Sequence, residues 1–208
     1  LILAICPFNF SGATQDVITA KVQKRDKVSS VGIVRSSKKK AKQLKYKDIK
    51  KMVNDAIDQA GGFNELISDG MTVILKPNLV YDKTYLTPDA SMDAEVNGCT
   101  TDWRVTKAVA ERVRKLNPNG KVYVMEGASQ PTDAMFFSLG YTKENFPMVD
   151  EFYALESPSI SGGVLEYESD KLVKVQLPSN VQKLDTQDCY YYNKIYYNAD
   201  VMISIPVL

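Results

Sequence analysis

The stretch MTVILKPNLV at residues 71–80 decides how this chain folds. Residues 71–75 form a short, largely apolar run that predicts a buried strand. Lys76-Pro77-Asn78 should end it, because proline has no N–H to donate to a neighbouring strand and restricts the residue before it. The stop leaves a cation and an amide at the carboxyl end of the strand. In open α/β sheets ligands bind outside the carboxyl ends of the strands, so this segment predicts where a site lies but not what reaction it serves.

Helical and extended patterns alternate along the chain. Apolar residues recur at helical spacing in residues 46–60 and again after Thr100-Thr101-Asp102, and a shorter helix is expected over residues 132–139. Apolar runs predict strands at residues 31–35, 71–75, 121–125 and 201–205. This order predicts an α/β fold with a three-layer, mostly parallel sheet flanked by helices.

The second half of the chain has a different pattern. Residues 164–167 and 172–177 alternate apolar and polar positions around a polar turn, which predicts an appended β-hairpin. Residues 78–100 form a long connection without periodicity, and connections of this length are usually functional or disordered. We expect residues 31–208 to form a single α/β domain, and an incomplete piece of a longer protein.

Residues 1–30 are expected to be the remnant of a signal peptide followed by a mobile segment. An apolar stretch is followed by the small residues Ser11-Gly12-Ala13, as at the cleavage site of an exported precursor. The expected location is therefore periplasmic or extracellular. An apolar first strand or a fragment boundary is the alternative. No stretch reaches the ~18 apolar residues that a transmembrane helix needs.

Composition excludes several classes of site. The chain has no histidine, so it cannot build a Ser-His-Asp triad, a Cys-His dyad or an HExxH zinc site. Its three cysteines, Cys6, Cys99 and Cys189, form no CxxC motif and supply no ligand set for an iron–sulfur cluster within this chain. Neither GxGxxG nor the P-loop motif occurs, and no cofactor is assigned. The net charge of +1 gives no general attraction to nucleic acid, and a solvated face explains the basic residues 21–51 better than a polyanion contact does.

Three candidate catalytic residues lie where predicted strands or helices begin or end. Lys76 could neutralise a phosphate or carboxylate, and Glu126 could act as a base or hold a metal ion together with Asp102. Right-handed crossovers in a parallel sheet should bring these positions to one edge. The simpler alternatives are that Lys76 only pairs with a carboxylate such as Glu126, that Asp102 only caps a helix, and that Glu126 only begins a turn.

Four further residues are candidates for ligand binding at the same edge. Asn78 could orient an anion, and the hydroxyls of Thr100 and Thr101 lie beside the free N–H groups at the start of a predicted helix, a common setting for anions. Ser129 follows the third predicted strand. A helix cap explains Thr101 equally well. No metal is assigned to this group.

Several linked motifs resemble the domain of unknown function 362 family. They are VGIV at residues 31–34, KPNLV at 76–80, GCTTD at 98–102, VYVMEGAS at 122–129, Gly-Tyr at 140–141, and Ala-Asp at 199–200 followed by VMISIPVL. The resemblance implies an α/β protein of unsettled activity, in a family in which some members are exported and some are joined to ferredoxin-type modules. Two departures are the absence of cluster-binding cysteines and the end of the chain at Leu208, where the family pattern usually continues.

Two functions are therefore expected. The first is binding of a small anionic ligand, a phosphate or a carboxylate, at the carboxyl ends of the strands, with catalysis left open. The alternative is a non-catalytic exported interaction domain. In that case, the loop at residues 81–97 and the aromatic segment at residues 190–197 would contact a protein or a glycan.

Overall fold

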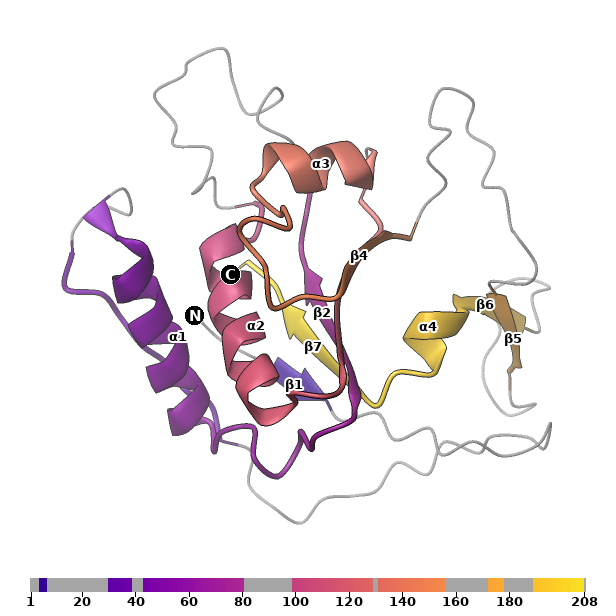
Figure 1. Ribbon diagram of the computed structural model, residues 1–208, viewed down its shortest axis with the longest axis horizontal. Helices are drawn as coiled ribbons and strands as arrows, with labels where there is room; N and C mark the ends of the chain where they lie inside the picture. Colours follow the sequence, from indigo (N-terminus) through magenta and orange to yellow (C-terminus); the bar gives the residue numbers. More distant parts are fainter. Residues whose placement is uncertain are drawn as a thin grey trace.

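A computed structural model describes residues 4–6, 30–38, 43–80, 99–128, 131–155, 172–177 and 189–207 (Figure 1). In this part of the chain the main sheet has the strand order β1-β7-β2-β3-β4. Its strands are β1 (Ala4–Cys6), β7 (Val201–Ile205), β2 (Thr72–Pro77), β3 (Lys121–Glu126) and β4 (Glu151–Ala154).

The main sheet is mostly parallel. Strand β2 runs parallel to both β3 and β7, and β3 runs parallel to β4, whereas β1 is antiparallel to β7. Helix α2 (Trp103–Leu116) follows β2 and precedes β3, and helix α3 (Thr132–Ser138) lies between β3 and β4. Parallel neighbours joined through helices are the βαβ arrangement. The α/β class predicted from the order of elements is confirmed.

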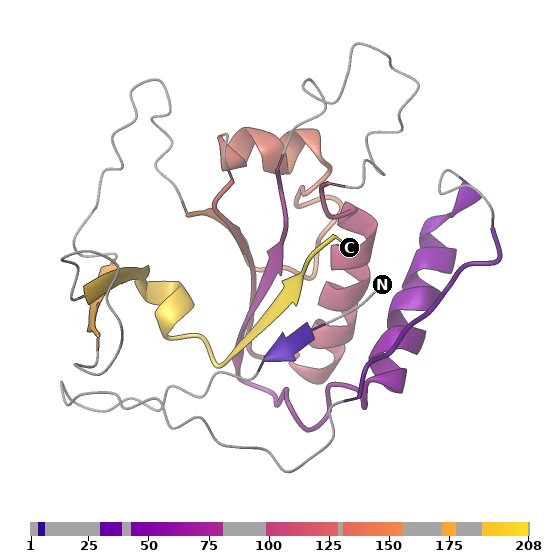
Figure 2. The same cartoon turned by 180° about the vertical axis from the view of Figure 1, so that it is seen from behind.

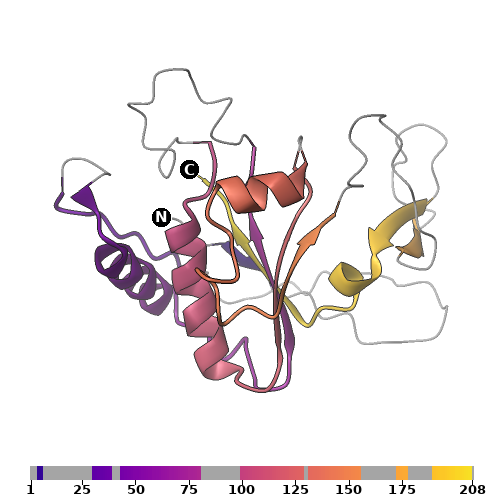
Figure 3. The ribbon, with the colours of Figure 1, turned by 45° about the horizontal axis from the view of Figure 1, so that its top comes forward.

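Helices α1 (Tyr46–Gln59) and α2 form a layer on one side of the main sheet (Figures 1 and 3). The buried residues of α1 are Ile49, Val53, Ala56 and Ile57, at the spacing that predicted this helix. Ile49, Val53 and Ile57 join the core formed by α2 and by alternate residues of the strands, such as Val73 and Leu75 of β2. Burying an aliphatic side chain of this size contributes about 1.5–3 kcal/mol, so this apolar stripe holds α1 against α2.

A smaller unit lies on the side of the sheet away from α1, where the view from behind also places it (Figures 2 and 3). It consists of the antiparallel strands β5 (Leu172–Gln176) and β6 (Cys189–Asn193), followed by the one-turn helix α4 (Lys194–Tyr197). An appended hairpin is thus present, but β5 pairs with β6. The partner predicted for β5, residues 164–167, lies outside the described residues.

The predicted strand at residues 31–35 is wrong. This segment has no strand structure, and Val31 and Ile33 are exposed. It lies along α1 instead. The N–H of Ile33 donates to Gln59 Oε1 at 3.2 Å. Gly32 lies so close to the backbone of Ala56 that an added Cβ would come within 2.0 Å of the Ala56 carbonyl oxygen. In the main sheet it is β1 that lies beside β7.

Strand β1 also bears on the amino-terminal expectation. Residues 4–6 are part of the sheet, paired from Ala4 with Ser204 to Cys6 with Met202, as the apolar-strand alternative anticipated. Export and the signal peptide remain predictions. Among the described residues, no helix is both long enough and apolar enough to cross a membrane.

Candidate functional site

Lys76 and Glu126 meet at the carboxyl edge of the main sheet. Lys76 is the fifth residue of β2, and Glu126 is the last residue of β3. The Lys76 Nζ lies 3.1 Å from Glu126 Oε1 and 3.0 Å from Oε2. A longer contact of 3.4 Å joins it to the carbonyl oxygen of Pro77, and the N–H of Gly127 donates to Glu126 Oε1 at 2.9 Å. The expectation that these strand ends meet at one edge is confirmed, and Lys76 pairs with Glu126, as its simpler alternative described.

The two partners of this ion pair differ in exposure. The Lys76 side chain keeps 35% of its surface exposed, whereas the Glu126 side chain keeps 6%. The carboxylate therefore lies on the protein side of the pair and the ammonium on the solvent side. Taking a carboxylate out of water is costly unless it is paired and hydrogen-bonded. Lys76 and the Gly127 N–H together provide that compensation.

Asn78 and Thr101 join three chain segments next to this pair. The Thr101 hydroxyl accepts from the Asn78 N–H at 2.9 Å and donates to the Ile205 carbonyl at 2.6 Å. The Thr101 N–H donates to the Asn78 carbonyl at 2.9 Å, and the Asn78 side-chain amide donates to the Cys99 carbonyl at 2.8 Å. The sequence correctly placed both residues at this edge, but their polar atoms are used to hold the ends of β2 and β7 to the start of α2.

Asp102 is the N-cap of α2. Its carboxylate accepts from the Arg104 N–H at 2.9 Å and from the Arg104 guanidinium, with 2.7 Å between Oδ2 and Nη2. A second guanidinium nitrogen donates to the Leu44 carbonyl and so ties this cap to the segment before α1. The structure thus gives Asp102 the helix-cap role that was the simpler alternative, with Arg104 as its ion-pair partner.

The remaining predicted positions divide into two kinds. Thr100 is buried next to Thr101 at this edge. Ser129 lies outside the described residues. Within the described ranges, no group of three or more cysteine, aspartate or glutamate side chains is arranged to hold a metal ion. A metal site on Asp102 and Glu126 therefore stays a prediction without a third described ligand.

Tyr141 lies beneath the site, and sequence reasoning assigned it no role there. Its hydroxyl donates to the Thr101 carbonyl at 3.0 Å and lies 3.1 Å from the Thr106 hydroxyl. Burial raises the pKa of Tyr141 strongly; the Thr106 hydrogen bond acts in the opposite direction, and the charges of Asp102 and Glu126 raise the pKa further. The phenol therefore stays protonated and acts as a fixed donor. The signals in the sequence were the Gly-Tyr motif at residues 140–141 and the place of Tyr141 directly after Gly140, which follows α3 with a φ of 85°.

Tyr196 of α4 approaches the sheet from the side opposite α1. Its hydroxyl contacts the sulfur of Met202 in β7. Burial raises the pKa of Tyr196, and the charge of Glu126 adds to that increase. The aromatic composition of residues 190–197 indicated a special segment without indicating this position.

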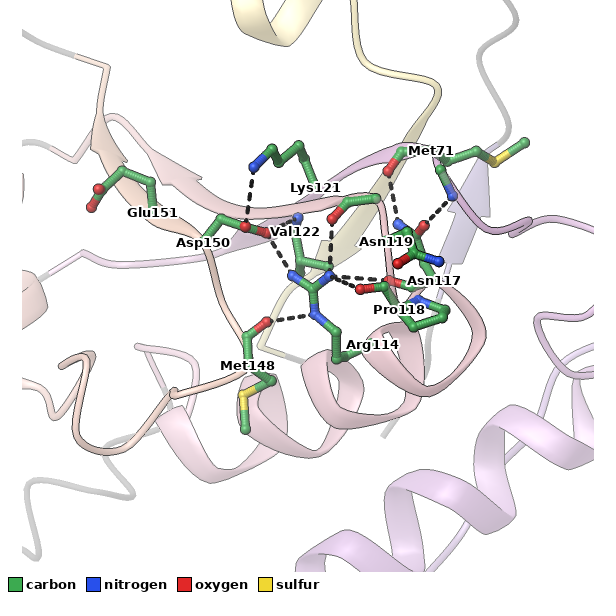
Figure 4. A network of polar contacts seen from close by, with 12 residues as sticks. Met71, Arg114, Asn117, Pro118, Asn119, Lys121, Val122, Met148, Asp150 and Glu151 are labelled. Atoms are coloured by element: carbon green, nitrogen blue, oxygen red, sulfur yellow. Dashed lines mark hydrogen bonds and ion pairs between the residues drawn. The ribbon is translucent and has the colours of Figure 1, made fainter.

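A second polar network lies at the other end of β3 (Figure 4). The Arg114 guanidinium lies 2.5 Å from Asp150 Oδ2, the same oxygen that accepts from the Val122 N–H at 2.8 Å. The other contacts of Arg114 are to backbone carbonyls, those of Asn117, Pro118, Gly120 and Met148. These contacts hold α2 to the turns on either side of β3, which is a structural task.

Comparisons with known proteins leave the family open. No protein-family model matches this chain, and searches of curated proteins and of solved structures find no match either.

Proposed function

We propose that this domain binds a small anionic ligand, a phosphate or a carboxylate, at the carboxyl ends of β2 and β3. The cation for this ligand is the ammonium of Lys76. The observation that carries the proposal is the unequal burial of the Lys76–Glu126 pair, 35% against 6% of the side-chain surface. An ion arriving from solvent meets the ammonium before it meets the carboxylate.

The hydrogen bonds of Lys76 are compatible with a ligand. An ammonium has three donors. Two of the recorded contacts go to the same carboxylate at 3.0 and 3.1 Å, and the third reaches Pro77 O at 3.4 Å, near the outer limit of a hydrogen bond. A ligand oxygen can replace that long contact while the pair with Glu126 stays in place. The Glu126 carboxylate keeps the ammonium at the strand end rather than letting it swing into solvent.

Catalysis at this position would rest on Glu126. Its carboxylate is buried, anchored by Lys76 and Gly127, and located at the same strand end as the bound anion would be. A carboxylate held in this way can accept a proton from a ligand once the ligand is seated on Lys76. The fixed phenol of Tyr141 and the Thr101 hydroxyl would position the surrounding backbone and take no part in proton transfer.

We also propose that the chain is related to the domain of unknown function 362 family, which it resembles, and that it is exported. KPNLV and VYVMEGAS contain Lys76 and Glu126, so two of the motifs that carry the resemblance meet in the ion pair. This agreement between motif and geometry supports the choice of site.

A thermal-shift titration tests the proposal. The probes are inorganic phosphate, pyrophosphate and malonate at constant ionic strength, and the proteins are the full chain and its Lys76→Ala variant. A ligand at ~100 times its dissociation constant adds about 2.7 kcal/mol to the free energy of unfolding, and each kcal/mol raises the melting temperature of a domain of this size by roughly 2–4 °C. We expect a shift of several degrees with at least one probe, and none in Lys76→Ala.

Two further variants make the result specific. Lys76→Arg keeps the charge and should keep most of the shift. Lys121→Ala removes an exposed lysine at the amino end of β3 and should leave the shift unchanged. If no probe shifts the folded wild-type protein, or if Lys121→Ala abolishes the shift as fully as Lys76→Ala does, the anion site is not at Lys76.

A further inference from the structure

A cavity of about 550 Å³ lies on the side of the main sheet away from α1 and α2. Among its lining residues are Thr72, Tyr123 and Tyr153 from the strands, and Asn193, Lys194 and Asn198 from around α4. Its volume is within the range of about 300–1,000 Å³ that small-molecule sites occupy. None of these six residues belongs to the Lys76 site.

The two tyrosines line the cavity from the sheet because side chains alternate across a strand. Val122 and Val124 of β3 enter the core against α2, which places Tyr123 on the opposite face. Tyr153 lies on that same face of β4, diagonally across from Tyr123. Their ring centroids are 5.3 Å apart, and the ring planes meet at 80°. The cavity thus has two aromatic walls nearly perpendicular to each other.

Polar groups from α4 lie across from these rings. The side-chain oxygen Oδ1 of Asn193 accepts from the N–H groups of Ile195 and Tyr196 and so caps α4, which fixes the orientation of the side-chain amide. Asn198 and Lys194 are exposed at the rim. Amides offer both donors and acceptors, and an ammonium offers donors and a positive charge. Burial raises the pKa of Tyr153, so its hydroxyl stays neutral and serves as donor or acceptor.

We infer that this cavity binds a pyranose sugar, and an acidic sugar more tightly than a neutral one. A pyranose has an apolar C–H face and a polar rim, and the negative face of an aromatic ring attracts such polarised C–H groups. One ring wall can carry the C–H face while the asparagines and Thr72 meet the hydroxyls. A flat aromatic base fits less well, because perpendicular rings cannot enclose it between parallel planes. Lys194 at the rim supplies the preference for a carboxylate.

Saturation-transfer NMR on the full chain tests this inference with methyl glucoside and glucuronate as probes and adenosine as a comparison. The ligands are used at about 10 mM, so that even weak binding, with a dissociation constant of about 1 mM, nearly saturates the cavity. We expect saturation transfer to both sugars, stronger than to adenosine. Lys194→Ala should weaken glucuronate binding about fivefold, the upper range for an exposed ion pair, and leave methyl glucoside unchanged.

Variants of the cavity itself decide the location. Tyr153→Ala should abolish the transfer, and Asn198→Trp should do so without removing any side chain from the sheet. Tyr191→Ala is the matched control, since Tyr191 is 57% exposed on β6 and does not line the cavity. Lys76→Ala should also leave the transfer unchanged, so the proposal for the cavity is tested independently of the proposal for the Lys76 site. Absence of transfer to either sugar, equal transfer in folded Asn198→Trp, or stronger transfer to adenosine would overturn the inference.

Discussion

Lys76 Nζ lies within 3.1 Å of both carboxylate oxygens of Glu126, although the two residues are 50 positions apart in the chain. The pair connects β2 to β3 at the edge where their carboxyl ends meet. It is also the point at which stability and the proposed function depend on the same atoms. The consequences for stability can be measured separately from ligand binding.

Removing the cation alone should destabilise the domain. Lys76→Ala leaves the buried Glu126 carboxylate without its ion-pair partner, and the cost should be about 2 kcal/mol, below the ~3–5 kcal/mol of a fully buried pair because Lys76 is partly exposed. The double variant Lys76→Ala/Glu126→Gln has no unpaired charge and should recover at least half of that loss. Urea unfolding of the three proteins measures both values. A single variant as stable as wild type would mean that Glu126 is solvated well enough without Lys76.

The Asp150 network should make stability depend on pH in the acid range. Burial alone would raise the pKa of Asp150, but the hydrogen bonds from Val122 and Arg114 and the charges of Arg114 and Lys121 outweigh it, so the pKa is lowered. The stabilisation is therefore fully present above the unfolded-state pKa of about 3.9. It is lost as the pH falls below that value and through the lower folded-state pKa.

Asp150→Asn should flatten this part of the pH profile and cost about 2 kcal/mol at neutral pH, the size of one charge-assisted hydrogen bond. Urea midpoints measured between pH 2.5 and pH 7 would check both expectations. Asp133→Asn, which changes an exposed carboxylate on α3, is the control. An Asp150→Asn profile parallel to that of wild type would show that Asp150 does not contribute to the acid sensitivity.

The Thr101 hydroxyl should matter more than its methyl group. Thr101→Val keeps the shape but leaves the Asn78 N–H and the Ile205 carbonyl without their partner. Each unsatisfied buried group costs about 1–3 kcal/mol, so we expect a loss of about 3 kcal/mol. Thr101→Ser keeps the hydroxyl and should lose less than half as much. If serine and valine cost the same, packing of the methyl group and not the hydrogen bonds holds this junction.

Gly120 should tolerate no side chain. A Cβ there would come within 2.2 Å of the Met71 carbonyl oxygen and 2.0 Å of Asn117 Oδ1. Asn117 is buried and cannot move aside freely. Its side-chain amide donates to the Met71 carbonyl (Figure 4) and accepts from the N–H of Gly70. Gly120→Ala should therefore cost about 3 kcal/mol, within the range for overpacking a well-packed region.

Gly61→Ala provides the comparison for that measurement. Gly61 has a φ of 101° and nothing within 4 Å of an added Cβ, so only backbone strain is involved. The expected cost is about 1 kcal/mol, clearly less than at Gly120. Thermal melts of the two variants would rank them, and the reverse order would mean that the turn at Gly120 relaxes easily.

Elements with a clear apolar pattern were predictable from the sequence. Residues 46–60 and 201–205 were predicted as a helix and a strand, and they form α1 and β7 with ends that differ by no more than one residue. Strand β4 was not predicted, because four residues with intermediate or high exposure carry too little alternation to stand out. The strand predicted at residues 31–35 was wrong because an apolar run alone does not indicate whether it pairs with a sheet or lies along a helix.

The site was predictable in position but only partly in role. The proline at position 77 placed Lys76 near the end of one predicted strand. The third predicted strand placed Glu126 at the end of a second strand, expected in the same sheet. The neighbour relation came from the parallel pairing that the sequence pattern implied. The use of Thr101 and Asp102 as a junction and a cap depends on Ile205 and Arg104, and no local pattern indicates those partners.

The sequence by itself determined most of the helical and extended segments, that the central strand ends close to Pro77, and that a lysine and a glutamate lie at the carboxyl ends of two strands of the same sheet. These are local properties, since periodicity and proline act over a few residues. Only the tertiary structure decided that β1 lies beside β7, that the glutamate is buried behind the lysine, and that Tyr123 and Tyr153 share an outer face. Those relations depend on strand register and on what covers each face, which are set by pairings between residues far apart in the chain.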